Sequence, residues 1–217
     1  MNKQLKRKIV VINAHPSSTS FNHALMQAYI EAVPSDVQVE VIEIGRLNFE
    51  PNLKFGYEQR MELEPDLQAA WEKIMSADHL VWIFPVWWGG LPAVSKGFID
   101  RLFLPSQAFS YLENSNRIRG HLKDKTARII TTLDQAGWTY KWYFGEPSTR
   151  QLKDTTLKFC GVGSVMTHYL GPVRDSSLAQ RQIWLAFMQE LAQLDYNNLL
   201  KKSDQGVMQR LRLYWSN

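Results

Sequence analysis

The sequence contains a single cysteine, Cys160, among its 217 residues. One cysteine excludes an intrachain disulfide and a thiolate metal centre, and it is typical of a protein from a reducing compartment. Long apolar runs are also absent. The basic N-terminal segment contains only the short run Ile9 to Ile12, far below the roughly 20 residues that span a bilayer. We therefore expect a cytoplasmic protein that does not insert into membranes.

Several catalytic motifs are missing as well. The five histidines are scattered and no HExxH or CxxC pair occurs, so we expect no metal site. The sequence has no GxSxG elbow of a hydrolase, no GxxxxGK[ST] phosphate loop and no GxGxxG dinucleotide fingerprint. Cys160, directly before Gly161, is expected to be a buried apolar residue and not a reactive thiol.

The balance of charge is weakly basic. The formal net charge is +4, the basic residues are dispersed, and no nucleic-acid-binding motif accompanies them. We therefore expect no nucleic-acid partner, whereas attraction for small anionic ligands is consistent with this charge.

Short apolar runs rich in β-branched residues alternate with segments of helical periodicity. Strands are expected at 8–14, 37–44, 79–85, 127–133 and 164–170, and helices at 21–33, 66–77, 93–103, 149–159 and 177–194. This alternation predicts an α/β fold with a doubly wound, five-stranded parallel sheet and helices on both faces. Ligands of such sheets bind beyond the carboxyl ends of the strands, so the loops of interest are 15–22, 85–92 and 133–147.

No internal repeat or low-complexity linker divides the chain. We expect one domain over residues 1–217, with a core from about residue 8 to about residue 195 and a polar, aromatic C-terminal tail over 196–217. The long connection 45–63 and this tail are both candidate arms for a partner subunit.

The loop after the first expected strand is rich in hydroxyl groups. Four such residues, Ser17 to Ser20, precede the first expected helix, and no acidic residue occurs between His15 and Glu31. Because no internal carboxylate occupies the helix N-terminus, its free N–H groups and partial positive charge stay open to an external anion. The loop predicts a phosphate site, and a helix cap without a ligand is the alternative.

The segment FPVWWGGLP, Phe84 to Pro92, places two tryptophans directly after an expected buried strand. Proline and glycine fix such a loop and allow its backbone to approach a ligand closely. A flat aromatic ligand needs an apolar wall and backbone donors of this kind. Packing in the core or between subunits is the alternative for Trp87 and for Trp88.

Five segments in order, AHPSSTSFNHAL, DHLVWIFPVWWGGLPAVSKGFIDRLF, AFSYLENS, TTLDQAGWTY and LKFCGVGSV, resemble the NAD(P)H:quinone oxidoreductases. These flavodoxin-like proteins include modulators of drug activity and ancillary subunits of potassium efflux systems. The resemblance runs from about residue 8 to about residue 194 and is most specific between Phe84 and Phe103. It implies a flavodoxin-like fold.

The resemblance also implies a flavin cofactor, FAD with FMN as the alternative, and NADPH or NADH as co-substrate. The residues implied to hold the flavin phosphates are His15, Ser20, Phe21 and Asn22. Those implied to run along its ring are Pro85, Val86, Trp87, Trp88 and Gly89, and those implied at its pyrimidine end are Thr131, Thr132, Leu133, Asp134 and Gly137. Arg181 is the candidate for the adenine of FAD.

Phe109 and Tyr111 are implied to line the substrate pocket across the interface of a homodimer. The sequence departs from the family pattern in the loop after residue 132. Leu133 and Asp134 stand where many members have two glycines. No histidine occurs between His121 and His168, so the tyrosine–histidine pair of well-studied members is not carried over. The candidate catalytic hydroxyls are those of Tyr140 and Tyr143.

The implied activity is a two-electron hydride transfer from NAD(P)H to a quinone-like acceptor, in which both substrates use one site in turn by a ping-pong scheme. Two alternatives remain open at the level of sequence. One is a flavin-binding regulatory subunit of a membrane transporter, and the other is a reductase of azo or nitro compounds.

Overall fold

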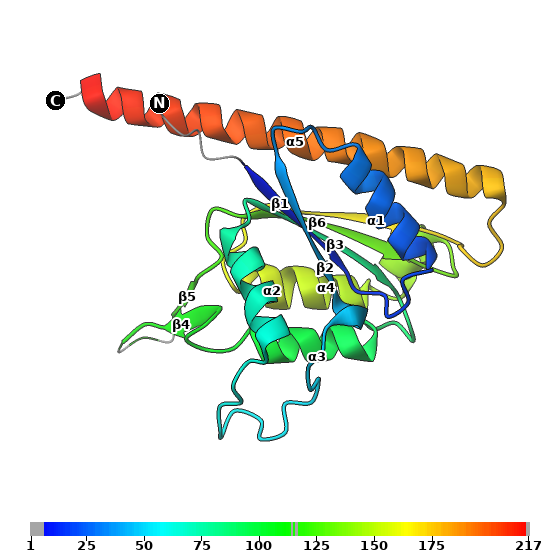
Figure 1. Cartoon of the computed structure of the whole chain (residues 1–217), viewed down its shortest axis with the longest axis horizontal. Coiled ribbons are helices and arrows are strands. Elements are labelled where there is room, and N and C mark those ends of the chain that lie inside the picture. Colours follow the sequence, from blue (N-terminus) through cyan, green and yellow to red (C-terminus); the bar gives the residue numbers. More distant parts are fainter. Residues whose placement is uncertain (1–6, 114, 116, 216–217) are drawn as a thin grey trace.

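The computed structural model describes residues 7–113, 115 and 117–215, with side chains described as far as Lys201. Five parallel strands form one sheet in the order β2-β1-β3-β6-β7 (Figure 1). Their bounds are β1 Lys8–Asn13, β2 Gln38–Glu43, β3 His79–Pro85, β6 Thr126–Thr132 and β7 Val165–Leu170. The predicted doubly wound parallel sheet is confirmed. The strand order reverses between β1 and β3, and that switch point directs a ligand to their carboxyl ends.

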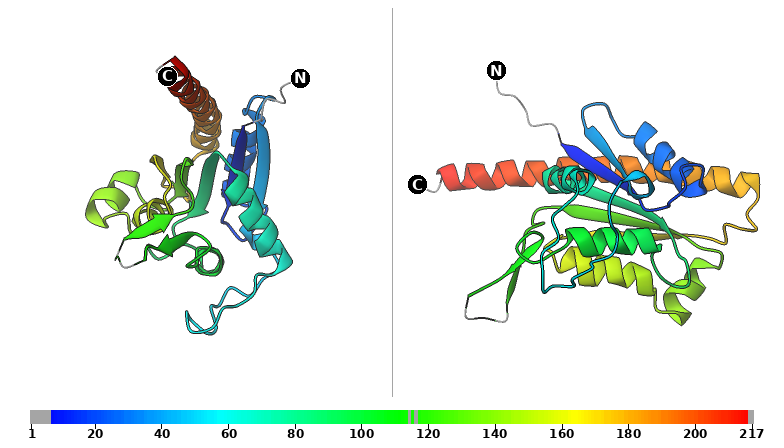
Figure 2. Two further views of the ribbon diagram at one scale, coloured as in Figure 1. Left: turned by 90° about the vertical axis from the view of Figure 1, so that its left-hand side faces the viewer. Right: turned by 60° about the horizontal axis from the view of Figure 1, so that its bottom comes forward.

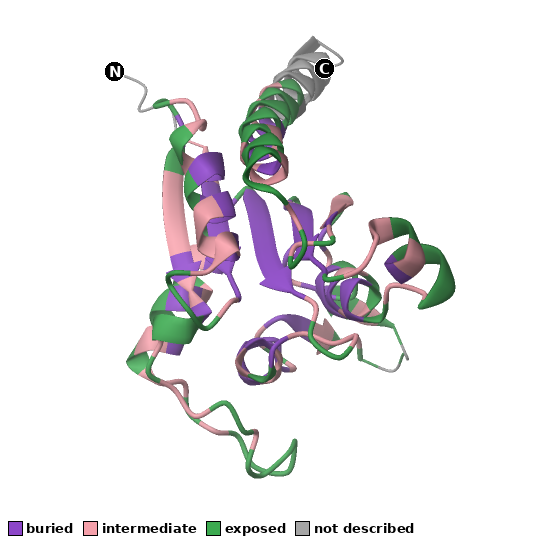
Figure 3. Cartoon of the chain, turned by 90° about the vertical axis from the view of Figure 1, so that its right-hand side faces the viewer, coloured by how far each residue is buried: buried purple, intermediate pink, exposed green. Residues whose placement is uncertain are grey.

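Helices cover both faces of the sheet (Figure 2). One face is covered by α1 (Phe21–Glu31) and α5 (Leu178–Trp215). The other is covered by α2 (Pro65–Ser76), α3 (Ala93–Leu102), α4 (Pro147–Leu152) and the π-helical η3 (Lys153–Lys158). Successive strand residues point to opposite faces, so β1 contributes to two hydrophobic clusters. The central strands are buried, and the exposed residues gather on loops and outer helix faces (Figure 3).

The C-terminal segment differs from the prediction. Residues 196–215 do not form a separate tail, because α5 continues through them to Trp215. Tyr196 and Leu199 extend the buried stripe that runs through Leu191, and the Tyr196 hydroxyl donates to Asp36 at 3.0 Å. The last two residues of the predicted tail lie outside the described residues. Within the described residues, no helix is both long enough and apolar enough to cross a membrane.

Two elements were not predicted. The first is an antiparallel hairpin of β4 (Phe109–Tyr111) and β5 (Ile118–Gly120), and the second is the π-helical η2 (Thr139–Tyr143). The hairpin follows α3, which runs back from the carboxyl edge, and it precedes the start of β6. It therefore lies toward the amino end of the sheet, away from the loops that follow β1 and β3 (Figure 1).

The long connection between η1 (Ile44–Arg46) and α2 is held by a buried arginine on α3. The Arg101 guanidinium donates to both carboxylate oxygens of Glu64, at 3.1 and 2.9 Å, and to the Glu62 carbonyl at 2.8 Å. The connection still displays two aromatic side chains, Phe55 and Tyr57, of which Tyr57 is 77% exposed. Its base is thus fixed to the fold, while its tip offers apolar surface.

Candidate functional site

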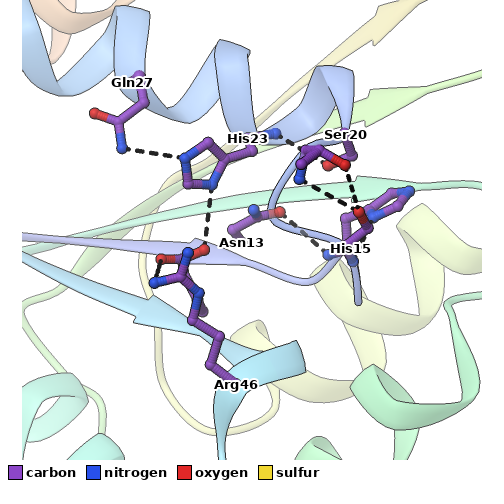
Figure 4. A network of polar contacts seen from close by, with 9 residues as sticks. Asn13, His15, Ser20, His23, Gln27 and Arg46 are labelled. Carbon is purple, nitrogen blue, oxygen red and sulfur yellow. Dashed lines mark hydrogen bonds and ion pairs between the residues drawn. The ribbon is translucent and has the colours of Figure 1, made fainter.

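The loop after β1 is ordered by its own side chains (Figure 4). The backbone N–H of His15 donates to Asn13 Oδ1 at 3.1 Å, and the N–H of Ser17 donates to His15 Nδ1 at 2.9 Å. Ser20 is the N-cap of α1, and its hydroxyl accepts from the N–H of His23 at 3.3 Å. Burial lowers the pKa of His15, so its ring is neutral near pH 7 and Nδ1 acts as the acceptor.

This loop leaves several donors open. Within the described residues, nothing accepts from the backbone N–H of Ser18, Phe21 or Asn22, and the first turn of α1 holds no acidic residue. The histidine in that turn points elsewhere, because His23 Nδ1 lies 3.2 Å from Glu43 Oε2 (Figure 4). A helix N-terminus with free N–H groups binds anions. The predicted phosphate-binding stretch therefore has the donors that it needs.

Two asparagine amides lie beneath the same loop. Asn22 Oδ1 accepts from the Thr132 hydroxyl at 3.0 Å, which joins the start of α1 to the end of β6. The Nδ2 atoms of Asn13 and Asn22 are buried and have no partner in the part of the chain that the structure describes. A buried donor without an acceptor costs about 1–3 kcal/mol, so such groups need an explanation. A ligand that brings acceptor atoms to this edge would supply one.

The loop after β3 is a tight two-residue turn. Trp87 and Gly90 exchange backbone hydrogen bonds of 3.0 and 2.8 Å, and the residues between them, Trp88 and Gly89, have φ of 51° and 74°. Both values are left-handed, as a type I′ turn requires. The preceding residues Pro85 and Val86 fix this turn to the sheet, because the Val86 N–H donates to the Thr132 carbonyl at 2.9 Å.

The two tryptophans have different surroundings. Trp87 is 45% exposed and meets the ring of His15 edge-on, with 5.5 Å between ring centroids. Trp88 is fully exposed. The structure thus brings the first loop and the tryptophan loop together through His15 and Trp87, and it leaves the indole of Trp88 displayed beyond them.

The third loop only partly follows the predicted pattern. Thr131 and Thr132 are buried at the end of β6. Leu133 is 3% exposed and is bonded through its backbone to the end of β7, so its side chain belongs to the core. Asp134 accepts from the backbone N–H and the guanidinium of Arg174, both at 3.1 Å. Its carboxylate is thereby held toward the β7–α5 connection.

Gly137 lies close to β7, and a Cβ at this position would be 2.9 Å from Tyr169 Cβ. A larger residue would force the third loop away from the sheet. The glycine therefore allows this loop to pack closely against β7.

The two candidate catalytic tyrosines are placed very differently. Tyr140 is 1% exposed, and its hydroxyl lies 2.5 Å from Ser148 Oγ and accepts from the N–H groups of Ser148 and Thr149 at 3.2 and 3.4 Å. It therefore holds the first turn of α4. Tyr143 is 79% exposed and packs edge-on against Phe144. Only the second hydroxyl is accessible, which removes the geometric basis for a catalytic role of Tyr140.

Arg181 and Phe21 are neighbours, although 160 residues separate them in the sequence. The guanidinium carbon of Arg181 lies 5.7 Å from the ring centroid of Phe21, and its Nε donates to Ser176 Oγ at 2.9 Å. The start of α5 thus lies beside the loop that is predicted to bind phosphate, and the role of Arg181 toward an adenine stays a prediction.

The predicted substrate-pocket residues are not brought to these loops within one chain. Phe109 is 8% exposed and packs against Phe159, with 4.9 Å between ring centroids. Tyr111 is 67% exposed. Both belong to the β4–β5 hairpin near the amino end of the sheet (Figure 1).

Sequence reasoning missed the pair formed by Glu146 and Tyr169. Glu146 has a left-handed backbone with φ of 48°, and its carboxylate accepts from the Tyr169 hydroxyl. Burial, together with this carboxylate, raises the pKa of Tyr169 to about 12. The two residues lie on different elements, 23 positions apart. No local pattern links them, although the sequence Gly-Glu-Pro does signal a turn.

An open groove adjoins the tryptophan turn. It has a volume of about 690 Å³ and lies between this turn and the α4–η3 segment, with Trp88, Gly89, Gly145, Arg150 and Thr155 among its lining residues. A groove of this size suits a small organic ligand. Elsewhere in the described residues, no group of three His, Cys, Asp or Glu side chains could hold a metal ion, and burial raises the pKa of the Cys160 thiol to about 12.

Comparison with known proteins places this arrangement in context. A family model described as flavodoxin-like fold matches residues 7–194. A protein of Haemophilus influenzae, an uncharacterized NAD(P)H oxidoreductase, is 26% identical over 202 residues, which are 90% of this chain and 98% of that protein. NAD(P)H dehydrogenase [quinone] 1 of Cavia porcellus is 26% identical over 71% of this chain. The match covers only 65% of that relative's length.

Two further proteins are similar at a higher identity. FMN-dependent NADH:quinone oxidoreductase 2 of Listeria monocytogenes is 30% identical over 73% of this chain and 83% of its own length. The crystal structure of Smu.1420 from Streptococcus mutans UA159 is 31% identical, with a TM-score of 0.75 over 85% of this chain and 98% of that one.

Proposed function

We propose, from the premise that the chain belongs to the flavodoxin-like fold family, that it is a flavin-dependent NAD(P)H oxidoreductase acting on quinone-like acceptors. One observation carries the proposal. An open anion-binding helix terminus, two unpartnered asparagine amides and a displayed tryptophan turn converge at the switch point of the sheet. Each matches one part of a flavin, namely its phosphate, its polar edge and its flat ring.

The residues present fit such a cofactor. The free N–H groups at the start of α1 and the Ser20 hydroxyl suit a phosphate, and Arg181 stands close enough to Phe21 to assist. The buried amide nitrogens of Asn13 and Asn22 need acceptor atoms, which a flavin phosphate or ring edge provides. A relative described as FMN-dependent favours FMN, so the sequence-based preference for FAD gives way to FMN with FAD as the alternative.

A bound flavin would supply the hydride chemistry between a reduced nicotinamide and an acceptor. The chain's own part is to hold the cofactor and to orient the substrates beside it. The Trp87–Gly90 turn presents backbone groups and a rigid apolar edge, while His15 packs against Trp87 as a neutral ring. Tyr143 offers the one accessible hydroxyl of the two predicted. We propose that both substrates use this single open site in turn, which gives a ping-pong scheme.

We further propose a homodimer, because the site is incomplete in one chain. Of the two predicted pocket residues, only Tyr111 is exposed enough to reach the carboxyl-edge loops of a second copy, whereas Phe109 packs in the core beneath it. The exposed Phe55 and Tyr57 of the long connection offer apolar contact surface for that copy. The test is sedimentation of the loaded protein, followed by Tyr111→Ala. This variant should raise the KM of the acceptor while the protein retains its flavin.

Ser20 offers a sharp test of the phosphate site. Asp and Asn are N-caps as good as Ser, so Ser20→Asp and Ser20→Asn should both preserve helix α1 and the unfolding free energy. Only Ser20→Asp places a carboxylate where the flavin phosphate is proposed to bind. We expect Ser20→Asp to weaken flavin binding by about tenfold or more, roughly 1.4 kcal/mol, and Ser20→Asn to bind as the parent does.

The measurements are fluorescence titration with FMN and with FAD, and turnover of NADPH and NADH with a menadione-type quinone. Parent protein that binds neither flavin would refute the proposal. Bound flavin without turnover would instead favour the regulatory subunit of a transporter. Turnover with azo compounds but not with quinones would move the acceptor class to that of an azoreductase.

A further inference from the structure

The groove beside the tryptophan turn carries a guanidinium that no carboxylate neutralises. Arg150 lines it, and no Asp or Glu oxygen in the described residues lies within 4.0 Å of its nitrogens. Asp154, the acidic residue in the same groove, is already paired with Lys158 at 3.0 Å. The groove therefore holds uncompensated positive charge.

The tryptophan turn supplies the other wall of the groove with an exposed indole on a fixed backbone. Trp88 is fully exposed, yet the type I′ turn fixes its backbone at φ of 51°. A bulky residue rarely adopts a left-handed conformation, and such strain of about 1–3 kcal/mol persists mainly at functional sites. An indole displayed in this way can stack on a flat ring without first losing conformational freedom of the main chain.

The two hydroxyl side chains of the groove are already engaged. The Ser148 hydroxyl bonds to Tyr140, and the Thr155 hydroxyl donates to the Gln151 carbonyl at 2.7 Å. Within the described residues, the groove thus leaves the Arg150 guanidinium, the Gln151 amide and the Trp88 indole available to a ligand.

We infer that the groove binds a planar aromatic ligand that carries an anionic group, with its ring against Trp88 and its anion at Arg150. The inference rests on the proposed function for the identity of the ligand. The anion then belongs either to an acidic quinone-type acceptor or to the phosphates of the nicotinamide dinucleotide. Arginine suits both, because its planar fork pairs with sulfonate, carboxylate or phosphate oxygens.

The test measures binding without turnover. Calorimetric titration of the flavin-loaded protein uses a naphthoquinone sulfonate, the unsubstituted naphthoquinone, and NADP⁺ and NAD⁺. Arg150→Gln removes the charge, Arg150→Lys keeps it, and Lys141→Gln removes an exposed cation that does not line the groove. The last variant controls for general attraction by surface charge.

Arg150→Gln should raise the Kd of the sulfonate by about tenfold and that of the uncharged quinone by less than about twofold. Arg150→Lys should recover most of the affinity, and Lys141→Gln should change neither Kd. If Arg150→Gln instead raises the Kd of the dinucleotides, the anion that Arg150 binds is their phosphate. The inference is overturned if Arg150→Gln leaves all four ligands unchanged, or if it weakens the uncharged quinone equally.

Because no electron transfer is measured, failure of this inference is distinguishable from failure of the proposed activity. If the protein binds flavin and its affinity depends on Arg150 but it shows no turnover, the inference about the groove stands and the proposed enzymatic activity is wrong.

Discussion

The two ends of the sheet contain buried polar groups that are treated in opposite ways. At the amino end, Arg128 of β6 donates to both carboxylate oxygens of Asp195 on α5, at 2.7 and 2.6 Å, and Tyr29 of α1 adds a third bond at 2.9 Å. At the carboxyl end, the buried amide nitrogens of Asn13 and Asn22 have no partner in the described residues. One arrangement is complete within the chain, and the other leaves donors open that we propose a ligand satisfies.

The electrostatics follow the same division. Burial alone would raise the pKa of Asp195, but its contacts with His79 and Arg128 outweigh this and hold the pKa well below its usual range. That carboxylate is therefore charged and neutralised by protein groups at every ordinary pH. At the carboxyl end, the open charge is the positive end of α1 and the guanidinium of Arg150. Charges that are satisfied internally hold the fold, whereas those left open await a ligand.

The largest effect is expected from a change in the amino-end cluster, which consists of Arg128, Asp195 and Tyr29. Asp195→Asn removes the charge opposite Arg128, which is 2% exposed, and leaves that guanidinium buried without a counter-charge. We expect a loss of about 3–5 kcal/mol in the free energy of unfolding, measured with urea. Asp154→Asn is the control, because its pair with Lys158 is exposed and should contribute less than about 1 kcal/mol. Equal losses in the two variants would contradict a structural role for the buried pair.

A smaller effect separates the two tyrosines of the loop after β6. Tyr140→Phe deprives the Ser148 and Thr149 N–H groups of their acceptor, and we expect a loss of about 1–3 kcal/mol. Tyr143→Phe removes an exposed hydroxyl and should change stability by less than about 0.5 kcal/mol. Turnover should fall only in the second variant if that hydroxyl serves the reaction. Loss of turnover in Tyr140→Phe at unchanged stability would return the catalytic role to Tyr140.

The fold was largely readable from the sequence because each strand and helix carries its own local pattern. The strand predicted at 79–85 has those bounds in the structure, since an uninterrupted apolar run ends at Pro85. The continuation of α5 was not readable, because within 195–201 only Tyr196 and Leu199 extend the apolar stripe and most of the other residues are polar. The β4–β5 hairpin was missed because three-residue strands carry too little periodicity to detect.

The site was readable to the extent that it lies in contiguous loops. The hydroxyl-rich turn and the tryptophan turn can each be recognised in the sequence, and their contact through His15 and Trp87 follows from the fold. Side-chain direction was not readable. Tyr140 and Tyr143 look alike in sequence, but the π-helical turn sends one inward and the other outward. Partners that meet only through tertiary packing, such as Glu146 with Tyr169, leave no local trace.

The pH dependence of stability tests the buried polar groups near the amino end of the sheet. Burial, with Arg128 close by, lowers the pKa of His168 from 6.5 to about 4. Below pH 6.5 the unfolded chain therefore takes up a proton that the folded chain excludes until about pH 4, so stability falls as the pH is lowered through this window. After allowance for partial exposure to solvent, we expect a loss of about 1–2 kcal/mol. Urea unfolding at several pH values should show it.

His168→Gln is the matched variant for this scan, because an amide can accept the Arg128 hydrogen bond but does not titrate in this range. Its unfolding free energy should be nearly flat between pH 6.5 and pH 4, where that of the parent declines. A parent and a variant with equal slopes would assign the pH dependence to other groups. The loss from Asp195 lies lower, because its depressed pKa delays protonation to more acidic pH.

The smallest expected effect is at the carboxyl end, where a substitution should raise the free energy of unfolding instead of lowering it. Trp88→Asn converts the turn to Asn-Gly, the pair that type I′ turns prefer, so we expect the free energy of unfolding to rise by about 0.5–1 kcal/mol. The control is Trp138→Asn, because Trp138 is also exposed but has an ordinary φ of −65° and should give no gain. Affinity for flat aromatic ligands should fall in the first variant only. Such a gain in stability with a loss of binding is expected where a residue is kept for a ligand and not for the fold, whereas every change at the amino-end cluster should lower stability.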